Sequence, residues 1–107
     1  MTERLPTGVL VSALLRRAND AGGFGAVLAK GDPQAGTVLV VAVEGGASRL
    51  VERGIGPDGR VALNNVTPAG ELGDYWQRRR ARDPDLWVIE LDIAGAERFA
   101  AEVLLAD

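Results

Sequence analysis

The apolar residues of this chain fall into segments of helical and extended spacing, which Gly and Pro residues separate. Apolar positions 10, 11, 14, 15 and 18 lie on one side of a helix, while Ser12, Arg16 and Asn19 lie on the other. Thr7 suits the N-cap position, and Gly22-Gly23 ends the segment. The pattern predicts an amphipathic helix over residues 9–21.

Three segments of strand length follow this helix. We expect strands over residues 24–30, 37–44 and 47–55, with a turn over residues 31–36 and a hairpin at Gly45-Gly46. A short fourth strand is possible from Arg60 to Asn64. The segment 37–44 is apolar on both faces, which is typical of a covered sheet, and a second subunit is one candidate cover.

The second half of the chain predicts a helix, a strand and a closing helix. Thr67-Pro68 favours a helix start, and Leu72 and Trp76 share one side of a helix that runs to about Arg82. Pro84 disfavours helical geometry in the residue before it, so the helix ends there. Residues 86–93 alternate as a strand does, and residues 96–105 have helical spacing.

This order of elements, α-β-β-β-(β)-α-β-α, predicts the α+β class. Short turns between the strands favour an antiparallel meander of four to five strands. We expect the helices to pack on one face of that sheet, which gives two layers. The chain has 107 residues, the length of one domain, so we expect residues 1–107 to form a single domain.

Composition narrows the chemistry open to such a domain. The chain has no histidine and no cysteine, which excludes a Ser-His-Asp triad, a thiolate nucleophile and the usual transition-metal ligands. Carboxylates, Lys30, Tyr75, Ser12 and Ser48 remain, and none stands in a recognisable catalytic motif. We therefore favour a binding protein over an enzyme, and we expect no catalytic residue, metal or cofactor.

Charge and hydropathy indicate the compartment and exclude some partners. Lys and Arg number 12 and Asp and Glu number 15, a formal net charge of −3, whereas nucleic-acid binders usually carry excess positive charge. No apolar run approaches the roughly 20 residues that cross a bilayer, and the first residues lack a signal-peptide pattern. We expect a cytoplasmic protein that binds neither nucleic acid nor membrane.

The turn after the first predicted strand is one candidate binding site. Asp32, Pro33 and Gly36 have the composition of a tight turn, and Lys30 lies beside them. Free N–H groups in such a loop, together with the Lys30 ammonium, are able to hold an anion or phosphate. The segment lacks G-x-x-x-x-G-K-[ST] spacing and no helix follows it, which favours a purely structural turn.

The arginine-rich end of the second predicted helix is another candidate. Arg78 and Arg82 belong to a run of four guanidinium groups that suits phosphates or an acidic partner. Cations also stabilise a helix C-terminus, and Asp83 and Asp85 offer ion-pair partners. Both interpretations fit the sequence, and the structural one is the more common.

The segment after this helix has three interpretations. Asp83 and Asp85 stand two residues apart, which suits a hard cation such as Mg²⁺, but Asp-Pro-Asp is equally a helix stop with side-chain-to-backbone bonds. Trp87 has the chemistry of an exposed interface anchor, yet it alternates with Ile89 as a core residue does. Turn and core are the favoured interpretations.

Two segments of the chain are similar to a known family. The sequence K-G-D-P-Q-A-G over residues 30–36 precedes V-L-V, and A-R-D-P-D-L-W-V-I-E occupies residues 81–90; R-L-P-T-G at residues 4–8 fits the same pattern. Together they resemble the small bacterial proteins of the domain-of-unknown-function 1491 family, over nearly the whole chain. The resemblance implies a self-contained domain and assigns no catalytic residue.

The sequence therefore predicts a small binding domain, which either forms a homodimer or binds another protein. The alternative is a binder, or a Mg²⁺-dependent enzyme, of a phosphate-bearing small molecule or nucleotide. In that alternative the basic residues hold the phosphate, and Asp32 or Asp83 holds the metal. The candidate contact residues are Lys30, Asp32, Pro33, Gly36, Arg78, Arg82, Asp83, Asp85 and Trp87.

Overall fold

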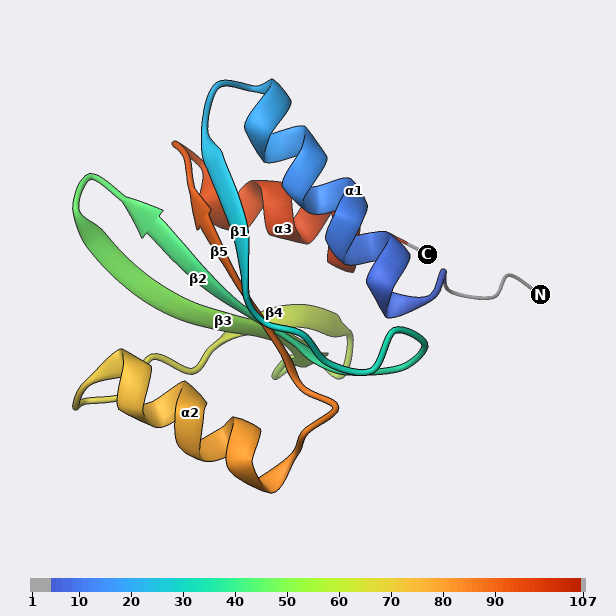
Figure 1. The fold of residues 1–107 in the computed structure, drawn as a ribbon, viewed down its shortest axis with the longest axis vertical. Helices are drawn as coiled ribbons and strands as arrows, with labels where there is room; N and C mark the ends of the chain where they lie inside the picture. Colours follow the sequence, from blue (N-terminus) through green and yellow to red (C-terminus); the bar gives the residue numbers. More distant parts are fainter. Residues whose placement is uncertain (1–4, 107) are drawn as a thin grey trace.

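Three helices and five strands make up the chain in this computed structural model, which describes residues 5–106 (Figure 1). The α+β class and the predicted order of elements are confirmed, including the short fourth strand. In chain order the elements are α1 (Thr7–Asp20), β1 (Phe24–Ala29), β2 (Val38–Glu44), β3 (Ala47–Ile55), β4 (Val61–Asn65), α2 (Leu72–Arg82), β5 (Trp87–Asp92) and α3 (Ala96–Leu104).

The start of α2 differs from the sequence prediction. The helix begins at Leu72 and not at Thr67, because Thr67 is fixed in the preceding loop. Its hydroxyl oxygen accepts the Leu50 N–H at 2.9 Å and its hydroxyl group donates to Asn65 Oδ1 at 2.6 Å. Side-chain bonds of this kind compete with helix formation.

The sheet is mixed, with strand order β1-β5-β2-β3-β4. The predicted antiparallel meander holds for β2, β3 and β4, and β1 also pairs antiparallel with β5, but β2 and β5 are parallel. The prediction of an uninterrupted meander is therefore wrong. β5 is buried along most of its length while β1 is more exposed. β5 carries the larger apolar side chains, and its place inside the sheet buries them while β1 lies at the edge.

Helices α1 and α3 cover one face of the sheet and form with it the predicted two-layer body (Figure 1). Leu14 of α1 and Val103 of α3 share a core with Val40 and Ile89, which point to the same face. The prediction that every helix lies on this face is wrong, because α2 lies against the other face (Figure 1).

The second core explains the position of α2. Leu39, Val41 and Val88 point away from α1, because successive side chains of a strand point to opposite faces. Leu72 and Trp76 of α2, as predicted, pack against this apolar face. Helix α2 of the same chain thus covers part of this apolar face, for which a second subunit was one candidate cover.

None of the helices within residues 5–106 combines the length and the apolar character that a membrane span requires. The longest, α1, has 14 residues, against about 20 for a bilayer.

Candidate functional site

The two segments that carry the family motifs meet in space and form what we call the clasp, residues 30–37 and 83–87. The Asp32 N–H donates to the Asp85 carbonyl oxygen at 3.0 Å. The indole N–H of Trp87 donates to the Asp32 carbonyl oxygen at 2.8 Å. Two candidate sites that are far apart in the sequence are therefore one structural unit.

Glycine is required on the inner side of the clasp. A Cβ atom at Gly31 would collide with the Asp85 carbonyl oxygen and would lie 2.7 Å from Trp87 Cδ1. A Cβ atom at Gly36 would meet the same carbonyl oxygen and lie 3.0 Å from the same ring carbon. Neither glycine has a positive φ, so close approach of the two loops is the reason for glycine here.

The start of α1 is bound to the same loop. The Gly8 N–H donates to the Pro33 carbonyl oxygen at 2.8 Å, and the Thr7 N–H donates to the Gln34 carbonyl oxygen at 3.2 Å. The Thr7 hydroxyl donates to the Gly36 carbonyl oxygen at 3.0 Å. The loop thus supplies acceptors to the first N–H groups of the helix, which have no partner inside the helix itself.

The N–H groups of the loop are also engaged within the protein. The Gln34 N–H donates to Asp32 Oδ1, and the Gly36 N–H donates to the Asp32 carbonyl oxygen, both at 3.3 Å. An anion-binding loop needs N–H groups that point freely at the ligand. This arrangement supports the interpretation of Asp32, Pro33 and Gly36 as a structural turn.

The four arginines of α2 do not act as one patch. Arg80 donates from Nη1 to the Pro84 carbonyl oxygen at 2.5 Å and from Nη2 to the Lys30 carbonyl oxygen at 2.9 Å, so it ties the helix to both halves of the clasp. Arg78 and Arg82 are exposed. Arg78 and Arg82 are the candidates from the sequence, whereas Arg79 and Arg80 make the hydrogen bonds that hold the helix in place.

Arg79 joins α2 to the sheet. Its guanidinium donates to both carboxylate oxygens of Glu52 on β3, at 2.8 and 3.2 Å, and lies 6.0 Å from the centroid of the Tyr75 ring. The hydrogen bond that Arg79 donates to Glu52 is the main cause that raises the pKa of Arg79 above its ordinary value, while partial burial opposes it. This bidentate pair anchors the helix to the sheet and engages two of the Arg79 donors within the protein.

Trp87 is a core residue. Its side chain is only 5% exposed and belongs to the core beneath α1 and α3, so its interpretation as an exposed anchor is wrong. Asp83 forms the predicted helix stop, since its Oδ1 accepts the Asp85 N–H at 3.2 Å. Within residues 5–106, no group of three or more Asp and Glu side chains is placed to hold a metal ion.

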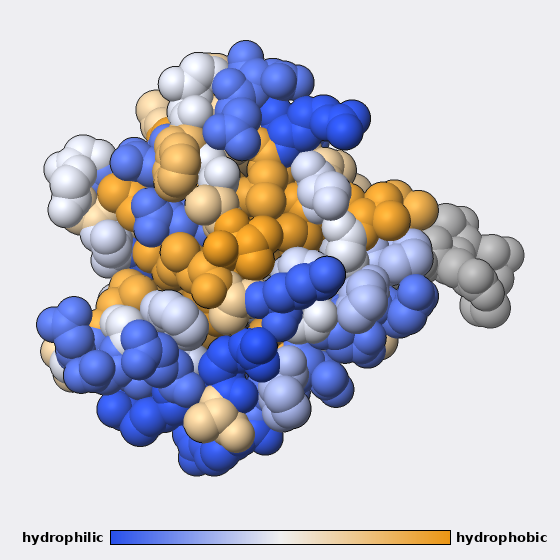
Figure 2. All heavy atoms as spheres, viewed as in Figure 1, coloured by the Kyte–Doolittle hydropathy of each residue, from blue (hydrophilic) through white to orange (hydrophobic). Residues whose placement is uncertain are grey.

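The edge strand β1 presents the most apolar open surface near the clasp. One side of β1 pairs with β5, and no strand of residues 5–106 pairs with its other side. Phe24, Val27 and Leu28 are 54%, 42% and 41% exposed. Figure 2 shows an apolar band between the α1 layer and α2, where β1 lies in Figure 1.

The sequence predicts the strand β1 but does not indicate that it lies at the edge of the sheet. The segment F-G-A-V-L-A contains no polar side chain, which would also suit a covered central strand. The signal that separates the two is the small size of the β1 side chains, because three of its six residues are Gly or Ala.

Two cavities in the structure are small. One, of about 90 Å³, lies beside residues 35–38 and Leu104. The other, of about 190 Å³, lies between the β2–β3 hairpin and α3. Sites for drug-sized ligands usually measure about 300–1,000 Å³, so both cavities are smaller than such sites.

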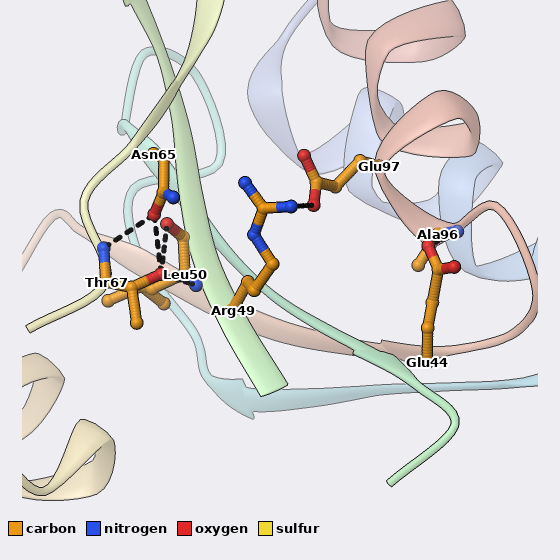
Figure 3. A network of polar contacts seen from close by, with 7 residues as sticks. All are labelled: Glu44, Arg49, Leu50, Asn65, Thr67, Ala96 and Glu97. Carbon is orange, nitrogen blue, oxygen red and sulfur yellow. Dashed lines mark hydrogen bonds and ion pairs between the residues drawn. The ribbon is translucent and has the colours of Figure 1, made fainter. Parts of the chain in front are cut away.

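The larger cavity has a charged lining that is paired within the protein (Figure 3). Arg49 Nη1 lies 3.2 Å from Glu97 Oε2, and Glu44 Oε1 accepts the Ala96 N–H at 3.0 Å. These contacts join the hairpin to the start of α3, a structural role that the sequence analysis did not find.

The fold and the clasp define a class of small α+β domains, with a mixed five-stranded sheet, helices on both faces and two loops bound beside the first helix. The chain belongs to the DUF1491 family of proteins of unknown function, whose family model matches residues 5–101. The resemblance that the two motifs indicated is confirmed.

Solved structures of the same family have this fold. A crystal structure of a DUF1491 protein from Caulobacter crescentus is 36% identical, with a TM-score of 0.76, and the match covers 89% of this chain and 94% of that one. An NMR structure of a DUF1491 protein from the same organism is also 36% identical, with a TM-score of 0.75 and coverage of 92% and 94%. A solution structure of a protein from A. tumefaciens is 30% identical, with a TM-score of 0.68 and coverage of 88% and 92%. A comparison with curated proteins finds no match.

Proposed function

We propose that this chain is a protein-binding domain, which acts by contact with another polypeptide and not by turnover of a metabolite. The observation that carries the proposal is the open edge of β1, with its exposed Phe24, Val27 and Leu28. An exposed apolar edge strand is a template for pairing with another chain, because its outer backbone groups have no strand partner. In β1 one of these groups, the Gly25 N–H, already donates to Asn19 Oδ1 at 3.2 Å.

The small cavities support this choice over a metabolite site. At about 90 and 190 Å³ they leave little room to bury a nucleotide, and the larger one is lined by charges that bind each other. A protein partner needs an exposed surface and no deep pocket.

The exposed charges of the clasp adjoin the same edge. Lys30 directly follows β1, and its carbonyl oxygen is held by Arg80 from α2. Arg82, Asp83 and Asp85 are exposed and lie in the segment that the Asp32–Asp85 backbone bond holds beside the Lys30 loop. We propose that these side chains form a polar rim beside the apolar edge, as at other protein interfaces.

The proposal is tested by capture and by ligand screening of the purified chain. Wild-type protein, Val27→Lys and the control Val61→Lys are cross-linked, alone and in a lysate of the source cells, and the products are weighed by mass spectrometry. We expect one complex of fixed stoichiometry that Val27→Lys loses and Val61→Lys keeps. Circular dichroism establishes that both variants remain folded.

A thermal-shift series with Mg²⁺ and nucleotides tests the alternative function. The proposal predicts no saturable rise in melting temperature. A saturable rise that Lys30→Ala or Arg82→Ala abolishes, together with no captured complex, would overturn it in favour of a phosphate-ligand site.

A further inference from the structure

We propose that residues 68–84, which contain α2, form a strap that opens from the sheet as one unit while the rest of the domain stays folded. Among residues 5–106, α2 is the one helix on its face of the sheet (Figure 1). Opening of the strap exposes the second core, so the strap is a conformational device that conceals an apolar face. The inference goes beyond the proposed function and does not depend on it.

The strap covers a buried apolar face without being buried itself. The five buried side chains of the second core are 0–5% exposed, whereas α2 has no buried residue. One side of the helix, with Leu72, Tyr75 and Trp76, packs against this core. Elements with little buried apolar surface open at a lower free energy than core strands. Burial therefore predicts that α2 leaves the sheet before the strands separate.

Both ends of the strap are attached to the sheet. Before the strap, the Thr67 hydroxyl oxygen accepts the Leu50 N–H at 2.9 Å. After it, the Asp85 carbonyl oxygen accepts the Asp32 N–H at 3.0 Å. A Cβ atom at Gly70 would have nothing within 4 Å, so the loop that leads into α2 has room to move. The strap is thus free to swing away between two attached points.

Two arginines supply hydrogen bonds that fasten the strap to the rest of the domain. Arg79 donates to both carboxylate oxygens of Glu52 on β3, and Arg80 Nη2 donates to the Lys30 carbonyl oxygen. Arg78, directly before them, is exposed. Removal of the Arg79 guanidinium should therefore favour the open strap, whereas removal of the Arg78 guanidinium should not.

The strap is also connected to the end of β1. Lys30 directly follows this strand, and Arg80 holds its carbonyl oxygen. Ala29, the last residue of β1, pairs with Val88 and packs against the second core. Opening breaks the Arg80 bond and joins the uncovered core to the apolar side chains of β1. The position of the strap thus sets the extent of the apolar surface beside this edge.

Native-state hydrogen exchange in low urea measures the opening in wild-type protein. Helix α2 has 11 residues, and isolated helices shorter than roughly 12–15 residues are marginal in water, so its amides exchange when the strap opens. We expect the α2 amides to share one opening free energy and one urea dependence, both below those of β2 and β5. Exchange that grades from the helix ends, or that matches β2 and β5, would overturn the proposal.

Substitutions inside and outside the strap separate its opening from global unfolding. Val103→Ala, in the core beneath α3, should speed exchange of the β2 and β5 amides at least about tenfold and leave the α2 amides unchanged. Arg79→Gln should speed the α2 amides about tenfold, whereas Arg78→Gln should not. Equal acceleration of α2 and the strands by Val103→Ala, or equal α2 exchange in the two arginine variants, would contradict the strap.

A thiol beneath the strap gives an independent measurement. The chain has no cysteine, so one introduced thiol reports on one position. Val88 and Val40 are both 0% exposed, beneath α2 and in the core under α1 respectively. With each rate divided by that of the same variant unfolded in urea, the Val88→Cys thiol should react with Ellman's reagent at least about tenfold faster than the Val40→Cys thiol. Equal rates would overturn the proposal, and circular dichroism establishes that both variants are folded.

Discussion

Two glycines decide how closely the loops of the clasp approach each other. The composition of residues 31–36 predicted a turn, which the bonds of Asp32 bear out. The need for glycine at Gly31 and Gly36 was not predictable from the sequence. A side chain at either position would collide with the carbonyl oxygen of Asp85, which is roughly 50 residues away along the chain. By contrast, Gly45 and Gly46 have φ of +57° and +83°, as a predicted hairpin turn requires.

Gly31→Ala and Gly36→Ala should each lower the free energy of unfolding by about 1–3 kcal/mol, since the methyl group would push the two loops apart. Urea denaturation measures the change. Gly73→Ala in α2 is the control: its Cβ would have nothing within 4 Å, and alanine favours helix, so stability should hold or rise. Wild-type stability in both clasp variants would contradict the close packing described above.

Glu44 acts at the start of α3 from a different element. The residue before this helix, Gly95, has a left-handed conformation and forms no side-chain cap. The carboxylate of Glu44 at the end of β2 accepts the Ala96 N–H at 3.0 Å instead (Figure 3). A cap supplied across 52 positions leaves no local signal in the sequence.

Glu44→Ala should therefore lower the free energy of unfolding by about 0.5–1 kcal/mol, because a helix N-terminus loses an anion and an acceptor. Glu44→Gln keeps an acceptor oxygen and should lose less. Thermal unfolding at pH 7 compares the two variants. Equal stability of Glu44→Ala and wild type would show that the contact contributes nothing.

At the scale of elements, α2 is the least firmly packed helix. It has no fully buried residue, whereas α1 and α3 have several. Leu72, Tyr75 and Trp76 pack against the second core, and Arg79 and Arg80 add polar bonds to the sheet and clasp. The sequence predicted the helix and its apolar side, but not which face of the sheet it covers.

The Arg79–Glu52 pair should contribute measurably to the attachment of α2. The two side chains are 25% and 18% exposed, so solvent screens them only in part. Arg79→Ala and Glu52→Ala should each cost about 1–2 kcal/mol, and a double-mutant cycle should give a coupling of about 1 kcal/mol. Purely additive losses would contradict a direct interaction.

The pH for this cycle follows from the raised pKa of Arg79. A cation whose pKa is higher in the folded state stabilises the fold below its ordinary pKa and loses that contribution only as the pH rises through the folded value. The Arg79 contribution is therefore complete at pH 7, where the unfolding of all four proteins is measured.

The sheet topology shows what the spacing of strands leaves open. Short turns make β2, β3 and β4 neighbours in the sheet, and the sequence predicted this arrangement. The long connection through α2 allows β5 to return in either direction, and local patterns do not decide between them. In the folded chain β5 runs parallel to β2, and Val88, Ile89 and Leu91 are buried on the two faces of the sheet.

At the scale of the whole molecule, the sheet has two edge strands, β1 without a polar side chain and β4 with Asn64 and Asn65. The second core, the clasp and the charged cavity are all satisfied by contacts within the chain. The apolar side chains of β1 remain exposed. The sequence indicated a binding domain from its lack of catalytic groups, whereas the candidate edge became visible only through the strand order.

Amide chemical shifts of isotope-labelled wild-type protein, recorded alone over a concentration series and with the captured partner, locate the surface that binds another polypeptide. We expect the amide shifts that change on binding to belong to β1 and to Lys30 directly after it. Changes centred on β4 or α2, or no changes in either series, would contradict a protein-binding edge at β1.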